Sequence, residues 1–448
     1  MSIQEVIQTI ENRYPHQPEF IQAVKEVASS IGSAYDSNPN YAKLKVFERL
    51  TEPDRIINFR VNWEDDNGNV QINRGWRVQF SNAIGPYKGG LRFHPTVSES
   101  VLKFLGFEQI FKNALTGLPM GGAKGGSDFD PKGKSDNEIR RFCYAFIREL
   151  HQYIGKDMDV PAGDIGVGGR EVSYMFAMYK NLTHEYEGVL TGKGVGFGGS
   201  LIRTEATGYG AVYFLENMIA AQKDTMVGKK VLISGAGNVS LHAAEKATML
   251  GAKVLTVSDS KGTLYDPEGL DQTKIDWLKE QKAQRKPLEE YVQKFGGQWL
   301  AGEKPWQFDA DVAMPCATQN EVDENDAKKL VEHGVKYIVE GANMPLNIAA
   351  IDYVREHQVH YAPGKAANAG GVAVSGLEMS QNSVRQYRTF EELDQQLKNI
   401  MKDIHDNAAS AAKENGYGDD SYIDYMSGAN IAGFKRVADA LVAYGVLN

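Results

Sequence analysis

Three lysines in the first third of the chain have unusual neighbours. Lys88 and Lys124 are each followed by a pair of glycines, and Lys112 lies three residues after Gln109 on one face of an expected helix. Taken singly, each lysine is more simply interpreted as a solvated surface charge. A flexible glycine setting is unusual for such a charge, however. Three cations that converge on one cleft would suit a small substrate with two negative charges.

A carboxylate, Asp164, lies in a further glycine-rich segment, residues 161–169. It could form a turn or cap a helix, or it could carry a proton. A lysine that takes part in catalysis needs a pKa lowered from about 10.4 towards neutrality by burial and neighbouring cations. Lys124, between two glycine pairs, is the best placed of the three lysines. Lys124 and Asp164 are therefore the candidate catalytic residues, and the turn interpretation of Asp164 stays open.

A dinucleotide-binding pattern occurs further along the chain. The expected strand 230–234 runs into Gly235, Gly237 and Ser240, a G-x-G-x-x-S sequence that opens a helix over residues 239–250. Gly235 allows a tight turn, Gly237 lets a pyrophosphate approach the first amides of the helix, and the small Ser240 allows close packing on the strand. The strand and helix on either side are the context that this short motif requires, although a glycine turn used only for packing is the alternative.

The next expected strand, residues 253–257, ends in Ser258, Asp259, Ser260 and Lys261. An acid at this point favours the ribose hydroxyls of NAD, whereas hydroxyl and cationic groups can hold the 2′-phosphate of NADP. Two hydroxyls and one ammonium favour NADP over NAD here, and Asp259 opposes that preference. A solvated turn is the alternative for each residue taken singly.

Composition narrows the class of protein. The 448 residues carry 49 Lys and Arg against 58 Asp and Glu, a formal charge of −9, which argues against binding to nucleic acid. Apolar runs are shorter than the ~20 residues needed to cross a bilayer. With only Cys143 and Cys316, no disulfide framework or cysteine metal site is expected. We expect a cytoplasmic protein without a metal or a membrane partner.

The elements that must position these residues indicate an α/β protein of two domains. Alternating apolar residues predict a β-hairpin over residues 57–80 with one buried face, and apolar spacing predicts helices over 98–115 and 137–154. From about residue 200, strands alternate with helices, which is typical of a Rossmann-like, doubly wound parallel sheet. The charged stretch 266–304 is expected to be mostly helical surface. We assign residues 1–199, with the tail 421–448, to an N-terminal substrate-binding domain and residues 200–420 to a dinucleotide-binding domain.

Several long segments in the same order resemble the bacterial glutamate dehydrogenase family over nearly the whole chain. They are the lysine–glycine segments, the Asp164 turn, the dinucleotide fingerprint and the segments 203–210, 315–321, 340–345 and 368–372. The resemblance implies reversible oxidative deamination of L-glutamate to 2-oxoglutarate and ammonium, with hydride transfer to NADP and ammonium assimilation in the reductive direction. It also implies a homohexamer in which the N-terminal domain serves in oligomerisation.

The resemblance implies roles for individual residues. Lys88 and Ser375 would hold the distal carboxylate of the substrate. Gln109, Lys112, Gly163 and Asn368 would hold its α-carboxylate and amino end. Lys124 would polarise the carbonyl and the attacking water, and Asp164 would carry protons to and from the nitrogen. The resemblance adds Thr207, Asn238, Ala317 and Asn343 as cofactor contacts to Gly235 and Gly237 of the fingerprint and to Ser258, Ser260 and Lys261 at the end of the next strand.

Two other functions would require different residues at these positions. A related dehydrogenase of leucine, valine or phenylalanine would bind an apolar side chain, and an unpaired buried ammonium at Lys88 would then cost several kcal/mol. A catalytically silent nucleotide-binding protein would be expected to have lost Lys124 or Asp164, and both are present. The residues therefore favour a dehydrogenase of a dicarboxylic amino acid.

Overall fold

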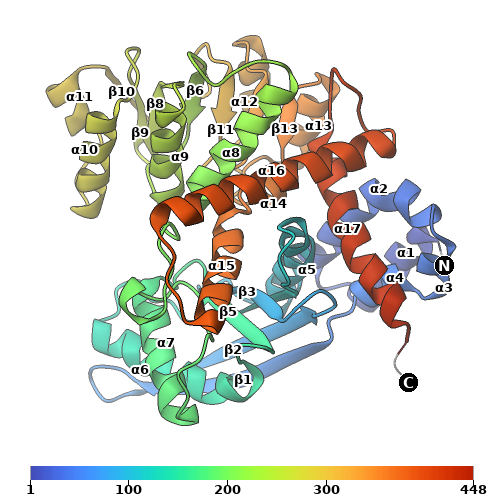
Figure 1. Cartoon of the computed structure of the whole chain (residues 1–448). Helices are drawn as coiled ribbons and strands as arrows, with labels where there is room; N and C mark the ends of the chain where they lie inside the picture. Colours follow the sequence, from blue (N-terminus) through green and yellow to red (C-terminus); the bar gives the residue numbers. More distant parts are fainter. Residues whose placement is uncertain (1, 447–448) are drawn as a thin grey trace. The chain divides into compact units, whose positions relative to one another are not determined.

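The computed structural model describes residues 2–446, which divide into two compact units (Figure 1). Unit 1 comprises the residues up to Leu201, Ala373–Leu393 and the residues from Asn430; unit 2 comprises Ile202–Val372 and Asp394–Ala429. The sequence-based division differs in placing 373–393 with the second domain and in starting the returning tail at residue 421. The assignment of a substrate-binding and a dinucleotide-binding domain remains a prediction.

Unit 1 contains a mixed five-stranded sheet in the order β1-β2-β4-β3-β5. β2 pairs antiparallel with β1 and β4, whereas β3 pairs parallel with β4 and β5. The strands are β1 Arg55–Glu64, β2 Val70–Ser81, β3 Tyr87–Phe93, β4 Gly122–Ser127 and β5 Asp159–Gly163. The helices that lie in this unit or reach into it are α1 Ile3–Arg13, α2 Pro18–Asp36, α3 Pro39–Lys43, α4 Val46–Leu50, α5 Glu99–Leu115, α6 Asp136–Leu150, α7 Gly169–Thr183, α15 Gly370–Val384 and α17 Tyr425–Tyr444.

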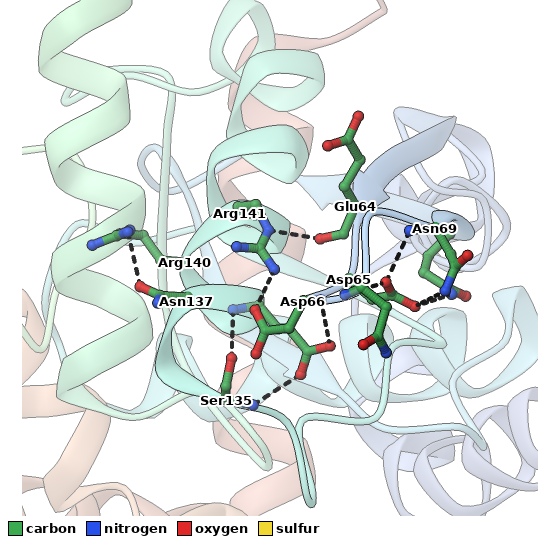
Figure 2. A network of polar contacts seen from close by, with 11 residues as sticks. Glu64, Asp65, Asp66, Asn69, Ser135, Asn137, Arg140 and Arg141 are labelled. Carbon is green, nitrogen blue, oxygen red and sulfur yellow. Dashed lines mark hydrogen bonds and ion pairs between the residues drawn. The ribbon is translucent and has the colours of Figure 1, made fainter.

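The predicted hairpin is confirmed as β1 and β2. In its turn, Asp65 accepts hydrogen bonds from the backbone of Asn69 and its side chain, at 2.9 and 3.1 Å. Arg141 of α6 donates to the Glu64 carbonyl at 2.6 Å and to the Asp66 carboxylate at 2.7 Å (Figure 2). The turn is thus fixed both by its own Asx chemistry and by a helix that packs on β1.

The expectation of one buried face is wrong for the second half of β2. From Gly75 to Ser81 every residue is buried, including Arg77 and Gln79 at 0% exposure. On one face, Phe80 packs against Phe107 of α5, with ring centroids 5.8 Å apart. On the other face, Arg77 and Gln79 are buried around the Asp159 carboxylate, to which both donate at 2.9 Å, so both faces of β2 are covered here. The alternation of apolar and polar residues therefore predicted which face of the sheet each side chain points to, but not whether that face is exposed to solvent.

Two segments that the sequence presented only as glycine clusters are the inner strands β3 and β4. A Cβ at Gly89 would collide with the carbonyl of Ala123, so glycine is required where β3 approaches β4. The tight approach places Lys88 and Lys124 on neighbouring strands of one sheet.

Unit 2 contains a five-stranded, all-parallel sheet in the order β13-β12-β11-β6-β7. Its strands are β6 Lys230–Ile233, β7 Lys253–Val254, β11 Val312–Met314, β12 Tyr337–Val339 and β13 His360–Ala362. The helices of this unit, or mostly of it, are α8 Ala206–Ala221, α9 Asn238–Met249, α10 Gln272–Ala283, α11 Glu290–Phe295, α12 Glu324–Glu332, α13 Ile348–Glu356, α14 Gly364–Ala367 and α16 Phe390–Glu414. The strand order reverses between β6 and β11, as in a doubly wound fold, which confirms the predicted fold class.

A second, antiparallel sheet in the order β10-β9-β8 follows β7. Its strands are β8 Thr256–Asp259, β9 Gly262–Tyr265 and β10 Gln298–Ala301. The expectation that the stretch 266–304 is mostly helical is wrong: α10 and α11 account for 18 of its 39 residues, β10 for four, and turns and loops for the rest. Within residues 2–446, no helix is both long enough and apolar enough to span a membrane.

Candidate active site

Lys88 is a buried ammonium at the start of β3. Its residue is 1% exposed, and its Nζ donates to the Val160 carbonyl at 3.0 Å and to the Thr191 hydroxyl at 2.7 Å. Lys88 pairs with Val160 across β3 and β5, so the sheet register fixes its backbone. An ammonium that is held in this way is preorganised to bind a carboxylate.

Lys124, Asp164 and Arg92 form a second cluster on the same sheet. Oδ2 of Asp164 accepts a hydrogen bond from Arg92 Nε at 2.7 Å and lies 3.3 Å from Lys124 Nζ. The Lys124 side chain is 7% exposed and that of Asp164 is 16% exposed. Gly90 makes room for this cluster, because a Cβ there would lie 2.9 Å from the Cβ of Asp164. Arg92 and Lys124 therefore both contact the Oδ2 atom of Asp164.

The proximity of these charges shifts their pKa values. Burial lowers the pKa of Lys124, and the Arg92 cation lowers it further, although Asp164 acts in the opposite direction. Burial alone would raise the pKa of Asp164, but Lys124 and Arg92 outweigh it and hold that pKa below its ordinary value. Lys124 releases its proton more readily than an ordinary lysine, and Asp164 stays ionised. The two groups are therefore a suitable pair for acid–base catalysis.

Helix α5 brings two further predicted residues to this sheet. Gln109 donates to the Asn113 side chain at 2.7 Å, and Asn113 in turn donates to the Lys88 carbonyl at 3.1 Å. Lys112, half-buried, is three residues after Gln109. The helix is therefore tied to β3 next to Lys88.

The remaining predicted residues of unit 1 are Gly163 and Ser375. Gly163 ends β5, where it pairs with Leu91 of β3, and immediately precedes Asp164. Ser375 lies on α15 and is 2% exposed. Unit 1 thus holds Lys88, Gln109, Lys112, Lys124, Gly163, Asp164 and Ser375.

The dinucleotide fingerprint of unit 2 has the expected geometry. Gly235 follows β6 with φ +80°, and a Cβ there would lie 3.2 Å from the Ser240 hydroxyl. Gly237 is the N-cap of α9, and a Cβ on it would meet no atom within 4 Å. Asn238, the first residue of α9, donates to the Thr204 carbonyl at 2.6 Å. The first turn of a 12-residue helix is therefore open to an anionic group.

Three more predicted cofactor residues lie on unit 2. Asn343 is exposed, and its Oδ1 accepts a hydrogen bond from Asn368 at 2.9 Å. Asn368 also donates to the Ala342 carbonyl at 3.0 Å. Thr207 is on the first turn of α8, and the exposed Ala317 follows β11. Asn368 therefore supports the loop after β12 from within unit 2.

The 2′-phosphate candidates occupy different environments. Ser258 is buried, and its hydroxyl accepts a hydrogen bond from the Gly235 amide at 2.9 Å. Ser260 and Lys261 are exposed in the two-residue turn between β8 and β9. Asp259 accepts from the Lys261 amide at 2.8 Å. Ser258 is thus placed to support the fingerprint turn, whereas the side chains of Ser260 and Lys261 are open to solvent.

Two protein-family models match the chain: Glutamate/Leucine/Phenylalanine/Valine dehydrogenase over residues 198–445 and the Glu/Leu/Phe/Val dehydrogenase dimerisation domain over residues 53–181. The chain belongs to the Glu/Leu/Phe/Val dehydrogenase family. It is 76% identical over 448 residues to an NADP-specific glutamate dehydrogenase of Psychrobacter sp. (strain TAD1), covering 100% of both chains. It is 56% identical over 447 residues to an NAD(P)-specific glutamate dehydrogenase of Xylanibacter ruminicola, again covering 100% of both. A solved glutamate dehydrogenase superposes with a TM-score of 0.96 at 52% identity, covering 100% of this chain and 99% of the other.

Several residues that hold the site together lie outside the motifs and were not predicted from the sequence. Arg92 and Thr191 contact Asp164 and Lys88 directly but belong to no charge pattern of their own. Arg77 and Asp159, both 0% exposed, form an ion pair beneath β3, and Arg77 also donates to the Gly89 carbonyl at 3.0 Å. Arg77 could have been singled out from the sequence because it is a charged residue within the alternating pattern of a central strand. Among residues 2–446, no cluster of three or more His, Cys, Asp or Glu could hold a metal ion.

Proposed function

We propose that the chain catalyses the reversible oxidative deamination of L-glutamate to 2-oxoglutarate and ammonium, with NADP as the hydride acceptor, and assimilates ammonium in the reductive direction. The observation that carries this proposal is the buried Lys88 ammonium on the strand next to the Lys124–Asp164 pair. A buried cation favours a substrate with a second carboxylate, because the Lys88 ammonium can donate a charge-assisted hydrogen bond to it, whereas an apolar side chain offers no acceptor.

The chain's own residues can be assigned to the steps of this reaction. The Asp164 carboxylate accepts a proton from the substrate ammonium, which frees the nitrogen lone pair as hydride leaves the α-carbon. Lys124, whose pKa is lowered, accepts in its neutral form a proton from the water that attacks the iminium carbon, and Asp164 returns its proton to the nitrogen as ammonia leaves. Gln109, Lys112 and the Gly163 backbone would hold the α-carboxylate end of the substrate.

The fingerprint of unit 2 fits a dinucleotide, because Gly237 leaves the helix start open. Gly235, Gly237 and Asn238 would hold the phosphates, with Thr207, Ala317 and Asn343 towards the nicotinamide end. When bound, the nicotinamide ring supplies the acceptor for hydride. Lys261 and Ser260 would favour NADP through the 2′-phosphate, and the name of the Psychrobacter relative supports this choice. Ser258 would contribute by fixing Gly235.

The proposal also covers the oligomeric state, the cellular location and the binding partners of the protein. The match to a dimerisation domain supports association of subunits, and we propose a cytoplasmic homohexamer. The proposed partners are L-glutamate, 2-oxoglutarate and ammonium, without nucleic acid or membrane.

Product identification tests the reaction. The purified protein is incubated with NADPH, 2-oxoglutarate and ¹⁵N-labelled ammonium, and the amino acid product is analysed by chiral chromatography and mass spectrometry. We expect ¹⁵N-labelled L-glutamate in an amount equal to the NADPH consumed. NADPH-dependent labelling of leucine or valine from their 2-oxo acids, without glutamate, would reject the assignment.

A further inference from the structure

The loop formed by residues 188–199 of unit 1, here named the Thr191 loop, adjoins the buried ammonium of Lys88. The Thr191 hydroxyl accepts from Lys88 Nζ at 2.7 Å, and the Thr191 amide donates to the Pro161 carbonyl at 2.9 Å. On either side, Leu190 has φ +62° and Gly192 has φ +88°. A leucine in the left-handed region is uncommon and persists only where surrounding contacts enforce it.

An ion pair provides those contacts. Lys193 Nζ lies 2.9 Å from Glu378 Oε1 and also donates to the Leu190 carbonyl. The other oxygen of Glu378 accepts from the Gly192 amide at 2.9 Å. The side chains are 1% and 0% exposed. The pair therefore fixes the loop immediately before and after Thr191.

The same pair ties the Thr191 loop to the helix that carries Ser375. Glu378 follows Ser375 by three residues on α15, so the two side chains lie on neighbouring positions of one helix face. A chain of contacts runs from Lys88 through Thr191 and Gly192 to Glu378, one turn from Ser375. The two residues assigned to the distal carboxylate are thus linked through one buried ion pair.

We propose that Lys193 and Glu378 are positioning residues that set specificity for the distal carboxylate, a role that rests on the proposed glutamate reaction. A buried ion pair contributes little net stability compared with apolar residues of similar volume. Its directional bonds instead hold Thr191, and with it Lys88, at a fixed place relative to Ser375. Removal of the pair loosens the recognition of the distal group and leaves the acid–base pair Lys124 and Asp164 intact.

The test compares two 2-oxo acids that differ only at the distal end, 2-oxoglutarate and 2-oxopentanoate. The variants are Glu378→Gln, Lys193→Met and the conservative Lys193→Arg. A matched control, Lys246→Met with Asp394→Asn, disrupts a partly buried ion pair of unit 2 that lies outside the assigned site. Steady-state constants are measured with NADPH and ammonium, and thermal unfolding checks that each variant is folded.

For Glu378→Gln and Lys193→Met, we expect the KM for 2-oxoglutarate to rise roughly tenfold or more, since small misplacements of binding groups cost up to a hundredfold. The efficiency with 2-oxopentanoate and the KM for NADPH should change little, and Lys193→Arg should recover most of the discrimination. The control should keep the wild-type ratio.

Equal losses for both 2-oxo acids, or an unchanged ratio, would overturn the positioning role and leave a structural role only. Because Glu378→Gln keeps the shape and the acceptor for Gly192, it provides a result even if Lys193→Met does not fold. A wild-type enzyme that fails to reduce 2-oxoglutarate would instead reject the proposed function.

Discussion

Replacing Lys88 with leucine is the sharpest test of how the substrate is chosen. The change removes a cation that is 1% exposed and that bonds to Val160 and Thr191. Leucine has a similar stem volume, so the sheet should tolerate it, and Ser375→Val can be added to make the distal site apolar.

The expected magnitude follows from the burial of Lys88. A charge-assisted hydrogen bond contributes about 1.5–3 kcal/mol. In the variant, the distal carboxylate of the substrate would be buried without its cationic partner, which costs about 3–5 kcal/mol. At 1.4 kcal/mol per tenfold, Lys88→Leu should lower kcat/KM for 2-oxoglutarate by roughly 10²- to 10³-fold. The same variant should improve the relative use of 2-oxopentanoate, because an apolar end then meets an apolar wall.

The assay follows NADPH oxidation at 340 nm with saturating ammonium and each 2-oxo acid in turn. Lys180→Leu, a surface lysine of α7 outside the assigned site, serves as the control and should keep the wild-type ratio. If Lys88→Leu is folded and keeps the wild-type preference for 2-oxoglutarate, the assignment of the distal carboxylate to Lys88 is wrong.

Three further predictions concern the chemistry, its pH dependence and the coenzyme. Asp164→Ser should lower kcat by roughly 10²-fold or more while coenzyme binding, measured by NADPH fluorescence, stays near wild type; near-normal turnover would favour the turn interpretation of Asp164. In Arg92→Gln, the pKa values of Lys124 and Asp164 should both rise, because the Arg92 cation lowers each of them. Activity should then be lost at a higher pH as the medium is acidified, while the Arg77 cation, which also lowers the pKa of Lys124, is unchanged. A kcat/KM profile whose acidic limb does not move would contradict this role of Arg92. Lys261→Glu should lower the NADPH to NADH efficiency ratio at least about tenfold, the value of one charge-assisted phosphate contact; an unaltered ratio would place that contact elsewhere.

Much of the fold could be predicted from the sequence, because local signals coincided with tertiary structure. The hairpin of β1 and β2 combines alternation with Asp-Asn-Gly turn chemistry, and α5 and α6 have regular apolar spacing and serine N-caps. The fingerprint at Gly235 and Gly237 lies between a strand and a helix, as the motif requires.

The glycine-rich strands β3 and β4 could not be predicted in the same way. Glycine has low β-propensity, and these strands exist because their neighbours pair with them on both sides. The burial of Arg77 and Gln79 likewise depends on tertiary contacts that no local pattern encodes.

For the site, residues within long motifs were predicted, and residues that act singly were not. Lys88, Lys124 and Asp164 were singled out by their glycine neighbours, and the structure places them on one sheet. Arg92 and Thr191 were missed because their roles depend on the strand register and on the path of a loop. For Ser258, a local pattern could not distinguish a hydroxyl that bonds to the Gly235 amide from one that faces a ligand.

The most direct test of the central claim is a substrate and coenzyme panel measured on the wild-type protein. The rates of NADPH and NADH oxidation are compared with 2-oxoglutarate, 4-methyl-2-oxopentanoate and phenylpyruvate, each with and without ammonium. We predict ammonium-dependent oxidation with 2-oxoglutarate, at least about tenfold above the apolar 2-oxo acids because these lack the charge-assisted hydrogen bond to Lys88, and a higher kcat/KM for NADPH than for NADH. A preference for an apolar 2-oxo acid, or no ammonium-dependent oxidation at all, would contradict it.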